Sequence, residues 1–526
     1  MKGFRKIRET CRLAARDGIK YAWVDTCCID KSNSAELSEA INSMYSWYQR
    51  AKVCFAYLSD LCLSSSAPKS TLAPDLISLL RGCRWFSRGW TLQELIAPAS
   101  VLFYEKNWGL VGNKKDWDAM LSDVTGISPD TMAYYDPASY SIAERMSWAA
   151  TRETTREEDK AYSLLGIFDV NMPMLYGEGA KAFRRLQEEI IRTGYDVSIF
   201  AWTKPIRRSP PWDIGVTPHG AFADAPGDFH SIPARLIRRQ WNEVGVTNAA
   251  VKLNLELYLV QMPETDGLTY VLPVCRGSSQ SAGNQYASAL GVGLEKIGSG
   301  RFVRKYVEKL VKIPDDGEAG MVRQIRRANV YILINPSYNI QSDSIFERLQ
   351  PDYKFSQGCR VVKAWPSGDW NDAESSFMTV IQEPNCGSFL LEVQSPRLTD
   401  DGPAKQRLTG EFMFLFSSLP NSDDTSTTKL NPDLVYTIVG YREHQMMLDI
   451  INMRMEAGDM DAKEMRLTLR NFAIPRQQTA AVPVGGDGKY IFTVRVVEGT
   501  LTHRLLFRSS SVANQPWDEW PHIYKH

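Results

Sequence analysis

The hydrophobic pattern changes near residue 205, and this change constrains the fold more than any other feature. Before it, short apolar runs alternate with stretches whose apolar residues recur at helical spacing. After it, apolar runs follow one another, separated by Gly, Pro, Asn and Asp. Strands that alternate with helices indicate a mainly parallel sheet covered on both faces, whereas a series of strands indicates packed antiparallel sheets. We therefore predict an α/β N-terminal part and a β-rich C-terminal part.

The chain has 526 residues, too many for one hydrophobic core. Domains usually contain about 100 to 200 residues, so several units are expected. We place an α/β domain at residues 1–114, a helical extension at 115–204 and a β-rich domain at 205–526. The last should be an antiparallel sandwich interrupted by one helix, at roughly 443–457.

The composition is that of a folded protein without a strong electrostatic field. Basic and acidic side chains number 61 each, so nothing attracts nucleic acid or an anionic membrane surface over long range. No apolar run reaches the roughly 18 residues that a membrane span needs, and none follows the basic N-terminus as in a secretory signal. We expect a cytoplasmic protein with neither nucleic acid nor membrane as a partner.

Six of the nine cysteines lie within the first 83 residues, and none forms a C-x-x-C pair. A structural zinc site needs paired ligands at short spacing, and the first histidine of the chain is His219. We predict no metal site, and thiols that serve as small buried hydrophobes in a reducing compartment.

Two kinds of segment alternate in the N-terminal part. Apolar residues on one helical face predict helices at 6–17, 34–51 and 91–96. Short apolar runs predict strands at 21–24, 53–58 and 100–104. Asn33 stands at a capping position before the second helix, and Pro98 ends the third.

The segment 88–94 (RGWTLQE) is the candidate site. Trp90 and Glu94 are four residues apart and share a helix face, near the carboxyl end of the strand 53–58, where ligands bind in open α/β sheets. A carboxylate beside a large aromatic ring suits ribose binding or the oxocarbenium-like transition state of glycosidic cleavage. The alternative is a Trp that anchors the helix and a Glu favoured by the helix dipole, and spacing alone favours this structural interpretation.

Two further carboxylates, Asp25 and Asp30, follow the strand 21–24. Paired carboxylates there suit Mg²⁺ or ribose, so both are candidate substrate-binding residues. The alternative is that Asp25 caps the turn and Asp30 starts a polar loop.

Two other polar segments are interpreted as structural. The turn 177–179 (GEG) lacks the remaining residues of a phosphate-binding loop and is predicted to start a helix. The charged residues of 152–159, with Thr155 and Glu158 at capping-box spacing, are predicted to form a solvated face.

Several long blocks resemble the fungal heterokaryon incompatibility (HET) domain, and the likeness covers about the first 200 residues. They are 21–31 (YAWVDTCCIDK), 34–44 (SAELSEAINSM) and 88–98 (RGWTLQELIAP), followed by 144–152, 158–168 and 172–179, which resemble that family's extended architecture.

The resemblance implies a role in fungal non-self recognition, in which fusion of incompatible individuals triggers growth arrest or cell death. HET domains are distantly similar to TIR domains, which implies a TIR-like or flavodoxin-like, mainly parallel sheet. Some TIR domains hydrolyse NAD with the glutamate of a Ser-x-Trp-Cys-x-x-Glu pattern. Here one extra residue follows Ser87 and Thr91 replaces the Cys, but the Trp-to-Glu spacing is kept. The resemblance therefore carries over Glu94 as the catalytic candidate and Trp90 beside it, with NAD as a substrate and no bound cofactor.

HET domains normally begin with a strand of the type Leu-Ser-(His/Tyr)-x-Trp-Gly, whereas this sequence begins at the helix 6–17. We therefore expect a sheet that lacks its first strand and exposes an edge. Three hypotheses follow. The chain is an NAD-cleaving death effector, or a non-catalytic module that signals by self-association or with another incompatibility protein, using the helix surface 37–48, or an inert truncated relative.

Overall fold

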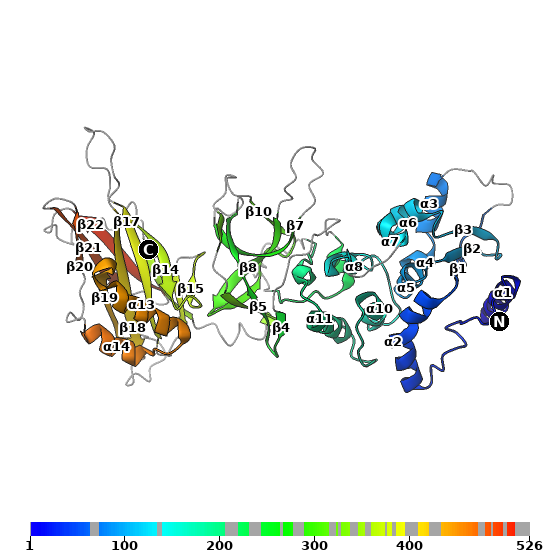
Figure 1. Ribbon diagram of the computed structural model, residues 1–526, viewed down its shortest axis with the longest axis horizontal. Helices are drawn as coiled ribbons and strands as arrows, with labels where there is room; N and C mark the ends of the chain where they lie inside the picture. Colours follow the sequence, from blue (N-terminus) through cyan, green and yellow to red (C-terminus); the bar gives the residue numbers. More distant parts are fainter. Residues whose placement is uncertain are drawn as a thin grey trace, which may run out of the picture.

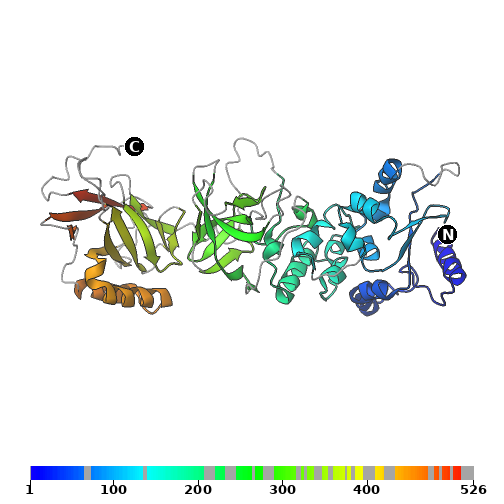
Figure 2. The same cartoon turned by 45° about the horizontal axis from the view of Figure 1, so that its top comes forward.

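The computed structural model describes residues 2–63, 73–133, 139–205, 219–230, 244–262, 267–276, 289–314, 322–324, 328–336, 346–352, 359–373, 376–380, 385–394, 409–419, 433–471, 479–484, 488–497 and 502–510. The elements follow one another along the long axis in chain order (Figure 1). A small sheet with its helices forms one end, helices and a curved sheet form the middle, and a layered β unit forms the other end. The view turned by 45° keeps this order (Figure 2).

Among the described residues, the N-terminal sheet has the order β1-β2-β3. Its strands are β1 (Cys54–Tyr57), β2 (Val101–Tyr104) and β3 (Leu110–Asn113). β1 and β2 are parallel, as expected for strands joined through helices, and β3 returns antiparallel to β2. The sequence predicts β1 and β2 but not β3, because its partly exposed residues carry no apolar run.

Residues 21–24 form no strand, so that prediction is wrong. Trp23 instead packs edge-on against Trp47 and Tyr48. The carbonyl of Val24 accepts the N–H groups of Cys27 and Cys28 as the chain turns. The apolar run therefore serves packing against the next helix rather than sheet pairing.

Helices cover both faces of the N-terminal sheet. On one face, Leu13 of α1 (Lys2–Arg16) packs with Tyr104 and Trp108. On the other face lie α2 (Ser34–Arg50), α3 (Ala73–Arg81), α4 (Arg84–Ser87) and α5 (Thr91–Ile96). Asn33 caps α2 as predicted, since its side chain accepts the N–H groups of Ala35 and Glu36.

The face of α2 at residues 37–48 is only partly a free surface. Ala40, Ile41 and Met44 are buried. A Cβ on Gly166 would lie 2.1 Å from the Cβ of Tyr45, so only glycine lets α10 (Leu165–Phe168) approach α2 this closely. Part of this face therefore packs inside the protein, while Trp47 at its end is 40% exposed.

The helical extension packs between the N-terminal sheet and the middle sheet. Its helices are α6 (Asp118–Thr125), α7 (Pro129–Ala133), α8 (Ile142–Ser147), α9 (Asp159–Tyr162), α10 (Leu165–Phe168) and α11 (Lys181–Thr193), followed by the short turns η2 (Val197–Phe200) and η3 (Pro226–Phe229). One continuous apolar core runs from Ile41 of α2 to Ile334 beyond the middle sheet. These parts therefore bury their apolar surface together.

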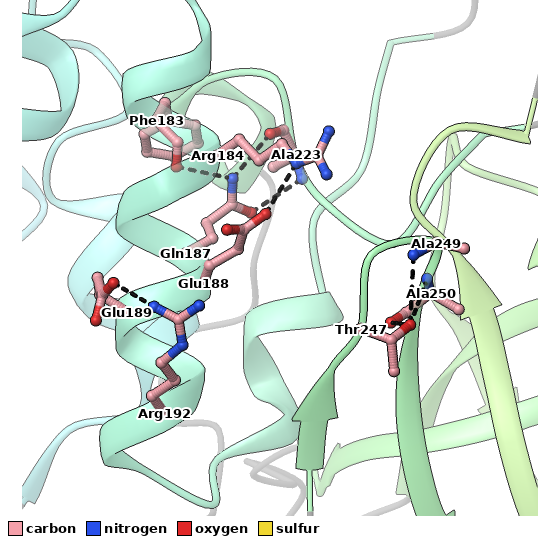
Figure 3. A network of polar contacts seen from close by, with 10 residues as sticks. All are labelled: Phe183, Arg184, Gln187, Glu188, Glu189, Arg192, Ala223, Thr247, Ala249 and Ala250. Carbon is pink, nitrogen blue, oxygen red and sulfur yellow. Dashed lines mark hydrogen bonds and ion pairs between the residues drawn. The ribbon is translucent and has the colours of Figure 1, made fainter. Parts of the chain in front are cut away.

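Gln187 joins α11 to the segment that precedes the middle sheet (Figure 3). Its Oε1 accepts the N–H of Ala223 at 3.0 Å, and its Nε2 donates to the carbonyls of Ala223 at 3.0 Å and Phe183 at 3.2 Å. The fully buried amide thus pairs with Ala223 as a neighbouring strand would. The ion pairs Arg184–Glu188 and Arg192–Glu189 lie on the outer side of the same helix.

The middle sheet has the order β11-β6-β7-β8-β9-β12-β5-β4 among the described residues, with β10 beside β8. Its strands are β4 (Val244–Val246), β5 (Ala250–Leu255), β6 (Tyr258–Gln261), β7 (Leu268–Arg276), β8 (Ala289–Gly298), β9 (Arg301–Arg304), β10 (Val311–Ile313), β11 (Val322–Gln324) and β12 (Ala328–Leu333). The pairs are antiparallel except β9 with β12.

The C-terminal unit stacks two sheets and a helical layer. One sheet contains β13 (Phe346–Asp352), β15 (Trp370–Asn371), β16 (Ser376–Val380), β20 (Thr479–Val484), β21 (Gly488–Val497) and β22 (Thr502–Ser510); the other contains β14 (Cys359–Trp365), β17 (Asn385–Gln394), β18 (Thr409–Leu419) and β19 (Asp433–Gly440). Phe377 of the first sheet contacts Phe389 and Phe416 of the second. On the outer face, Leu448 and Met465 pack on Met413. They belong to α13 (Tyr441–Ala457), which the sequence predicts, and α14 (Ala462–Asn471), which it does not.

Candidate functional site

A cavity of about 580 Å³ lies beside the N-terminal sheet. It is enclosed by α1, residues 19–25, the end of α2 and the entry to β1, and Glu94 lies in its wall. Its volume is in the range of small-molecule sites, which is roughly 300 to 1,000 Å³.

Glu94 is the half-buried acidic group of this wall. Its Oε2 accepts a hydrogen bond from the indole Nε1 of Trp85 at 3.3 Å. Burial raises the pKa of Glu94, and the carboxylate of Asp25 raises it further, against the opposing charge of Lys6. The site therefore holds a carboxyl group that ionises less readily than one in water.

The charge of Glu94 shifts the pKa values of the groups around it. Burial, and then the charge of Glu94, raises the pKa values of the Tyr48 phenol and the Cys54 thiol. Burial lowers the pKa of Arg152 to about 10, while Glu94 acts in the opposite direction. Tyr48 and Cys54 line the cavity with Glu94. Arg152 is a half-buried cation close enough to interact with Glu94.

The turn before α5 is held in place by a distant segment. The N–H of Gly89 donates to the carbonyl of Glu153 at 2.8 Å, and the N–H of Glu153 donates to the carbonyl of Ser87 at 2.6 Å. A Cβ on Gly89 would lie 2.6 Å from the Thr154 methyl group. The glycine of the RGW segment therefore permits the close approach that fixes where α5, and with it Glu94, begins.

Arg152 completes this support. Its Nη1 donates to the carbonyl of Arg88 at 2.9 Å and to the hydroxyl of Thr91 at 3.1 Å. The Thr91 hydroxyl in turn donates to the carbonyl of Trp85. Thr91 thus ties α4, α5 and Arg152 together.

The structure brings together two of the four site residues predicted from the sequence. Asp25 and Glu94 line the same cavity. Trp90 lies outside the lining and packs with Ile29 and Met44. Asp30 is exposed, and its carboxylate accepts the N–H and hydroxyl of Ser32, which hold its pKa below the usual range.

Sequence reasoning missed the basic and aromatic members of the lining, which include Lys6, Trp23, Trp47 and Tyr48. These three aromatic residues belong to segments whose pattern indicates core packing. Only their clustering near the carboxylates of Asp25 and Glu94 distinguishes them from ordinary core residues.

The predicted solvated face at 152–159 is wrong for Glu158 and Asp159, which are buried, whereas Arg156 and Glu157 are exposed as predicted. Glu158 is only 8% exposed, and its Oε1 accepts the N–H groups of Gly177 at 2.7 Å and Gly179 at 3.0 Å. Backbone N–H groups of Glu158 itself, Gly177 and Gly179 lower its pKa. Helix α9 starts after Glu158 rather than after a cap at Thr155. The turn 177–179 thus binds an anion that belongs to the chain.

The six cysteines of the first 83 residues divide into two groups. Cys54 and Cys83 are buried as predicted, whereas Cys11, Cys27, Cys28 and Cys62 are exposed, which the sequence did not predict. In the part of the chain that the structure describes, no three His, Cys, Asp or Glu side chains are arranged to hold a metal ion. No helix in that part is long and apolar enough to cross a membrane.

Comparison with known proteins gives two family matches. The model of the heterokaryon incompatibility protein (HET) family matches residues 4–73, and a domain of unknown function (DUF8212) matches residues 181–220. The vegetative incompatibility protein HET-E-1 of Podospora anserina is 49% identical over 189 residues, which are 36% of this chain and 14% of that protein. This chain therefore matches only a small part of that relative. No solved structure matches.

Proposed function

The chain carries a heterokaryon incompatibility (HET) domain, and from this premise we propose that it acts in fungal non-self recognition. The likeness to a vegetative incompatibility protein supports this role. In this proposal the N-terminal part is a TIR-like module acting in the cytoplasm, and its activation promotes growth arrest or cell death. The parallel pair β1–β2 with helices on both faces supports the TIR-like assignment.

The proposed activity is cleavage of the bond between nicotinamide and ribose in NAD. The observation that carries it is the half-buried carboxyl group of Glu94 in the wall of a cavity of about 580 Å³. Asp25 and the aromatic rings of Trp23 and Tyr48 share that cavity. Rings of this kind suit the flat bases of a dinucleotide, and carboxylates suit ribose hydroxyls.

In this proposal Glu94 stabilises the positive charge that develops on the substrate. When the bond from the nicotinamide nitrogen to ribose C1′ breaks, both electrons leave with nicotinamide, and positive charge develops on the ribose ring. Ionised Glu94 would stabilise that charge in a site where little water screens it. Water then adds to C1′ and loses a proton, which gives ADP-ribose. Ionisation of Glu94 is therefore required, and its raised pKa sets the pH above which cleavage proceeds.

The test compares two buried glutamates in purified full-length protein incubated with NAD. Glu94→Gln should reduce nicotinamide release by about a hundredfold or more, as expected when a charge-stabilising group is lost. Glu105→Gln is the matched control, because Glu105 is buried but accepts the N–H of Gly109 and lies outside the cavity lining. Failure of the wild-type protein to release nicotinamide would rule out cleavage.

Expression in a fungal host tests the wider role separately. Toxicity that falls with cellular NAD, and that Glu94→Gln removes, supports an NAD-cleaving effector. Toxicity that survives Glu94→Gln at constant NAD supports a non-catalytic signalling module instead. If overexpression leaves growth unchanged, the chain is an inert relative.

A further inference from the structure

Helix α13 carries apolar side chains on two opposite faces. On its inner face, Leu448 and Ile451 are buried and pack with residues of β17 and β18. On its outer face, Met446 is 81% exposed, Met453 is 66% exposed, and Ile450 is exposed as well. Figure 2 shows α13 as an outer layer of the C-terminal unit. An apolar helix face of this length that remains in water is typical of an interaction site.

The spacing of the exposed residues indicates what this face fits. Met446, Ile450, Met453 and Ala457 are exposed and follow one another at intervals of four, three and four residues. This is the spacing of the d and a positions of a coiled coil, in which two helices pack side by side along such a stripe. We name these four residues the α13 seam. The seam lies entirely beyond the kink at His444, in the regular part of α13, and ends at the last residue of the helix.

The charges that flank the α13 seam distinguish the possible partners. The heptad register places Asp449 and Glu456 at g positions and Arg454 at an e position. When two copies of one helix pack in parallel, a g residue faces the e residue five positions later in the other copy, so Asp449 faces Arg454. When the copies pack antiparallel, g residues face g residues, so carboxylates meet carboxylates. The charges therefore complement a second copy of α13 in the parallel orientation.

Arg454 is held in position for this contact. Its Nη1 and Nη2 donate to the carboxylate of Glu464 on α14 at 2.5 and 3.0 Å, and Nη2 also donates to the carbonyl of Asp459 at 2.8 Å. Because a guanidinium has five N–H donors, these contacts leave donors for a further carboxylate. The ion pair also fixes α14 beside the flank of α13 rather than over the α13 seam, whose residues stay exposed.

We propose that the α13 seam joins two copies of this chain through a parallel, two-stranded coiled coil. The seam residues of one copy would pack against the same residues of the other, and each Asp449 would pair with Arg454 across the interface. Such a contact is two-fold symmetric and closes on itself, so it gives a dimer rather than a filament. The dimer goes beyond the proposed function, since it requires neither NAD nor Glu94, and α13 lies at the opposite end of the molecule from the Glu94 cavity (Figure 1).

The test is sedimentation velocity of the full-length protein between about 1 and 100 µM. A seam of four residues gives a weak contact, so the dissociation constant of the dimer should be on the order of 10 µM. Met453→Glu should raise it about a hundredfold, because it places a charge in the seam. Gln445→Glu adds the same charge at an exposed position of the same helix outside the seam and should leave it unchanged. A wild-type protein that stays monomeric, a dimer that survives Met453→Glu, or equal weakening by both variants overturns the proposal.

Asp449→Arg tests the orientation of the two helices. In the parallel dimer the introduced charge would face Arg454, so the dissociation constant should rise about tenfold. In an antiparallel pair it would meet carboxylates of the other copy, so association would strengthen. Glu39→Arg, an exposed charge reversal on α2, should change nothing. Stronger or unchanged association in Asp449→Arg, or equal weakening in Glu39→Arg, overturns the proposal. The substituted residues lie outside the Glu94 cavity lining, so nicotinamide release remains an independent measurement.

Discussion

The Glu94 cavity and the clasp formed by Glu158, Gly177 and Gly179 each withdraw a carboxyl group from water, but by different means. Glu158 receives two N–H groups from the 177–179 turn, and these bonds help to lower its pKa. Glu94 accepts a hydrogen bond from the indole N–H of Trp85, and burial raises the pKa of Glu94. The first environment is built around the charged form, and the second disfavours it.

The difference indicates how each region uses its carboxylate. Both lone-pair directions of the Glu158 oxygen are occupied by N–H donors from its own chain, so this charge stabilises the fold. Glu94 adjoins a cavity and keeps acceptor capacity that a ligand can use. Burial alone therefore does not identify a functional carboxylate, and the adjoining cavity and few internal donors are what make Glu94 the stronger candidate.

The largest effect is expected in the pH dependence of NAD cleavage. Below the raised pKa of Glu94, kcat/KM should fall about tenfold per pH unit, because only the ionised form stabilises the developing charge. Asp25→Asn should move the profile to lower pH, since the charge of Asp25 helps to raise that pKa. Initial rates of nicotinamide release across pH measure both effects. If the pH profile of Asp25→Asn matches that of the wild-type protein, Asp25 does not raise the pKa of Glu94.

Removal of the Glu158 carboxylate should give the largest loss of stability. Glu158→Ala leaves the N–H groups of Gly177 and Gly179 without their acceptor and should lower the local free energy of unfolding by about 3 kcal/mol. Native-state hydrogen exchange of residues 159–193 measures this change. The exposed neighbour Glu157 gives the control, and Glu157→Ala should cost less than about 0.5 kcal/mol. Equal losses would mean that the clasp contributes nothing.

Gln187 is a neutral counterpart of the Glu158 clasp. Gln187→Met keeps the volume but leaves the N–H and carbonyl of Ala223 unpaired, so a smaller loss of about 2 kcal/mol is expected. Hydrogen exchange of the Ala223 amide reports it. Arg184→Met, which removes an ion pair on the same helix, should cost at most about 0.5 kcal/mol. A loss at Gln187 as large as that at Glu158 would show that geometry rather than charge strengthens these clasps.

The smallest expected effects are the pH slopes of stability, and they have opposite signs. The pKa of Glu94 lies above its ordinary value of 4.5, so the folded state binds its proton more tightly and stability is lost as pH rises through the folded pKa. Glu94→Gln should therefore melt above the wild-type protein by a margin that grows with pH. The pKa of Glu158 is lowered, so its contribution is present above 4.5 and lost as pH falls through the folded pKa. Melting curves of Glu94→Gln and Glu158→Ala from roughly pH 2 to pH 8, each compared with the wild-type protein, cover both windows, and slopes of one sign would contradict the assignment.

Local patterns predicted the N-terminal elements well where chemistry within a few residues decides them. The cap at Asn33 and helix α5, which ends before Pro98, are examples. The run 21–24 was misassigned because an apolar pattern does not reveal whether a sheet edge or a helix face receives it. Strand β3 was missed because its pairing with β2, rather than its own apolar content, forms it.

The site was only partly predictable for a related reason. The sequence identified Glu94 and Asp25 but could not tell that α1 and the end of α2 close a cavity over them. Glu158 was misinterpreted because its donors lie about twenty residues further along the chain, in a turn with no periodic signal. Whether a charged residue is solvated depends on such distant donors, which single-sequence patterns do not contain.

The continuous core from Ile41 to Ile334 has a consequence for how such proteins diversify. Gene shuffling works where the joined pieces each fold alone, and here a crossover between α11 and the middle sheet would split one core. The portion that can be exchanged intact between relatives is therefore the N-terminal module together with the helices and the middle sheet. The C-terminal unit, which has its own apolar clusters, is the part that recombination can replace.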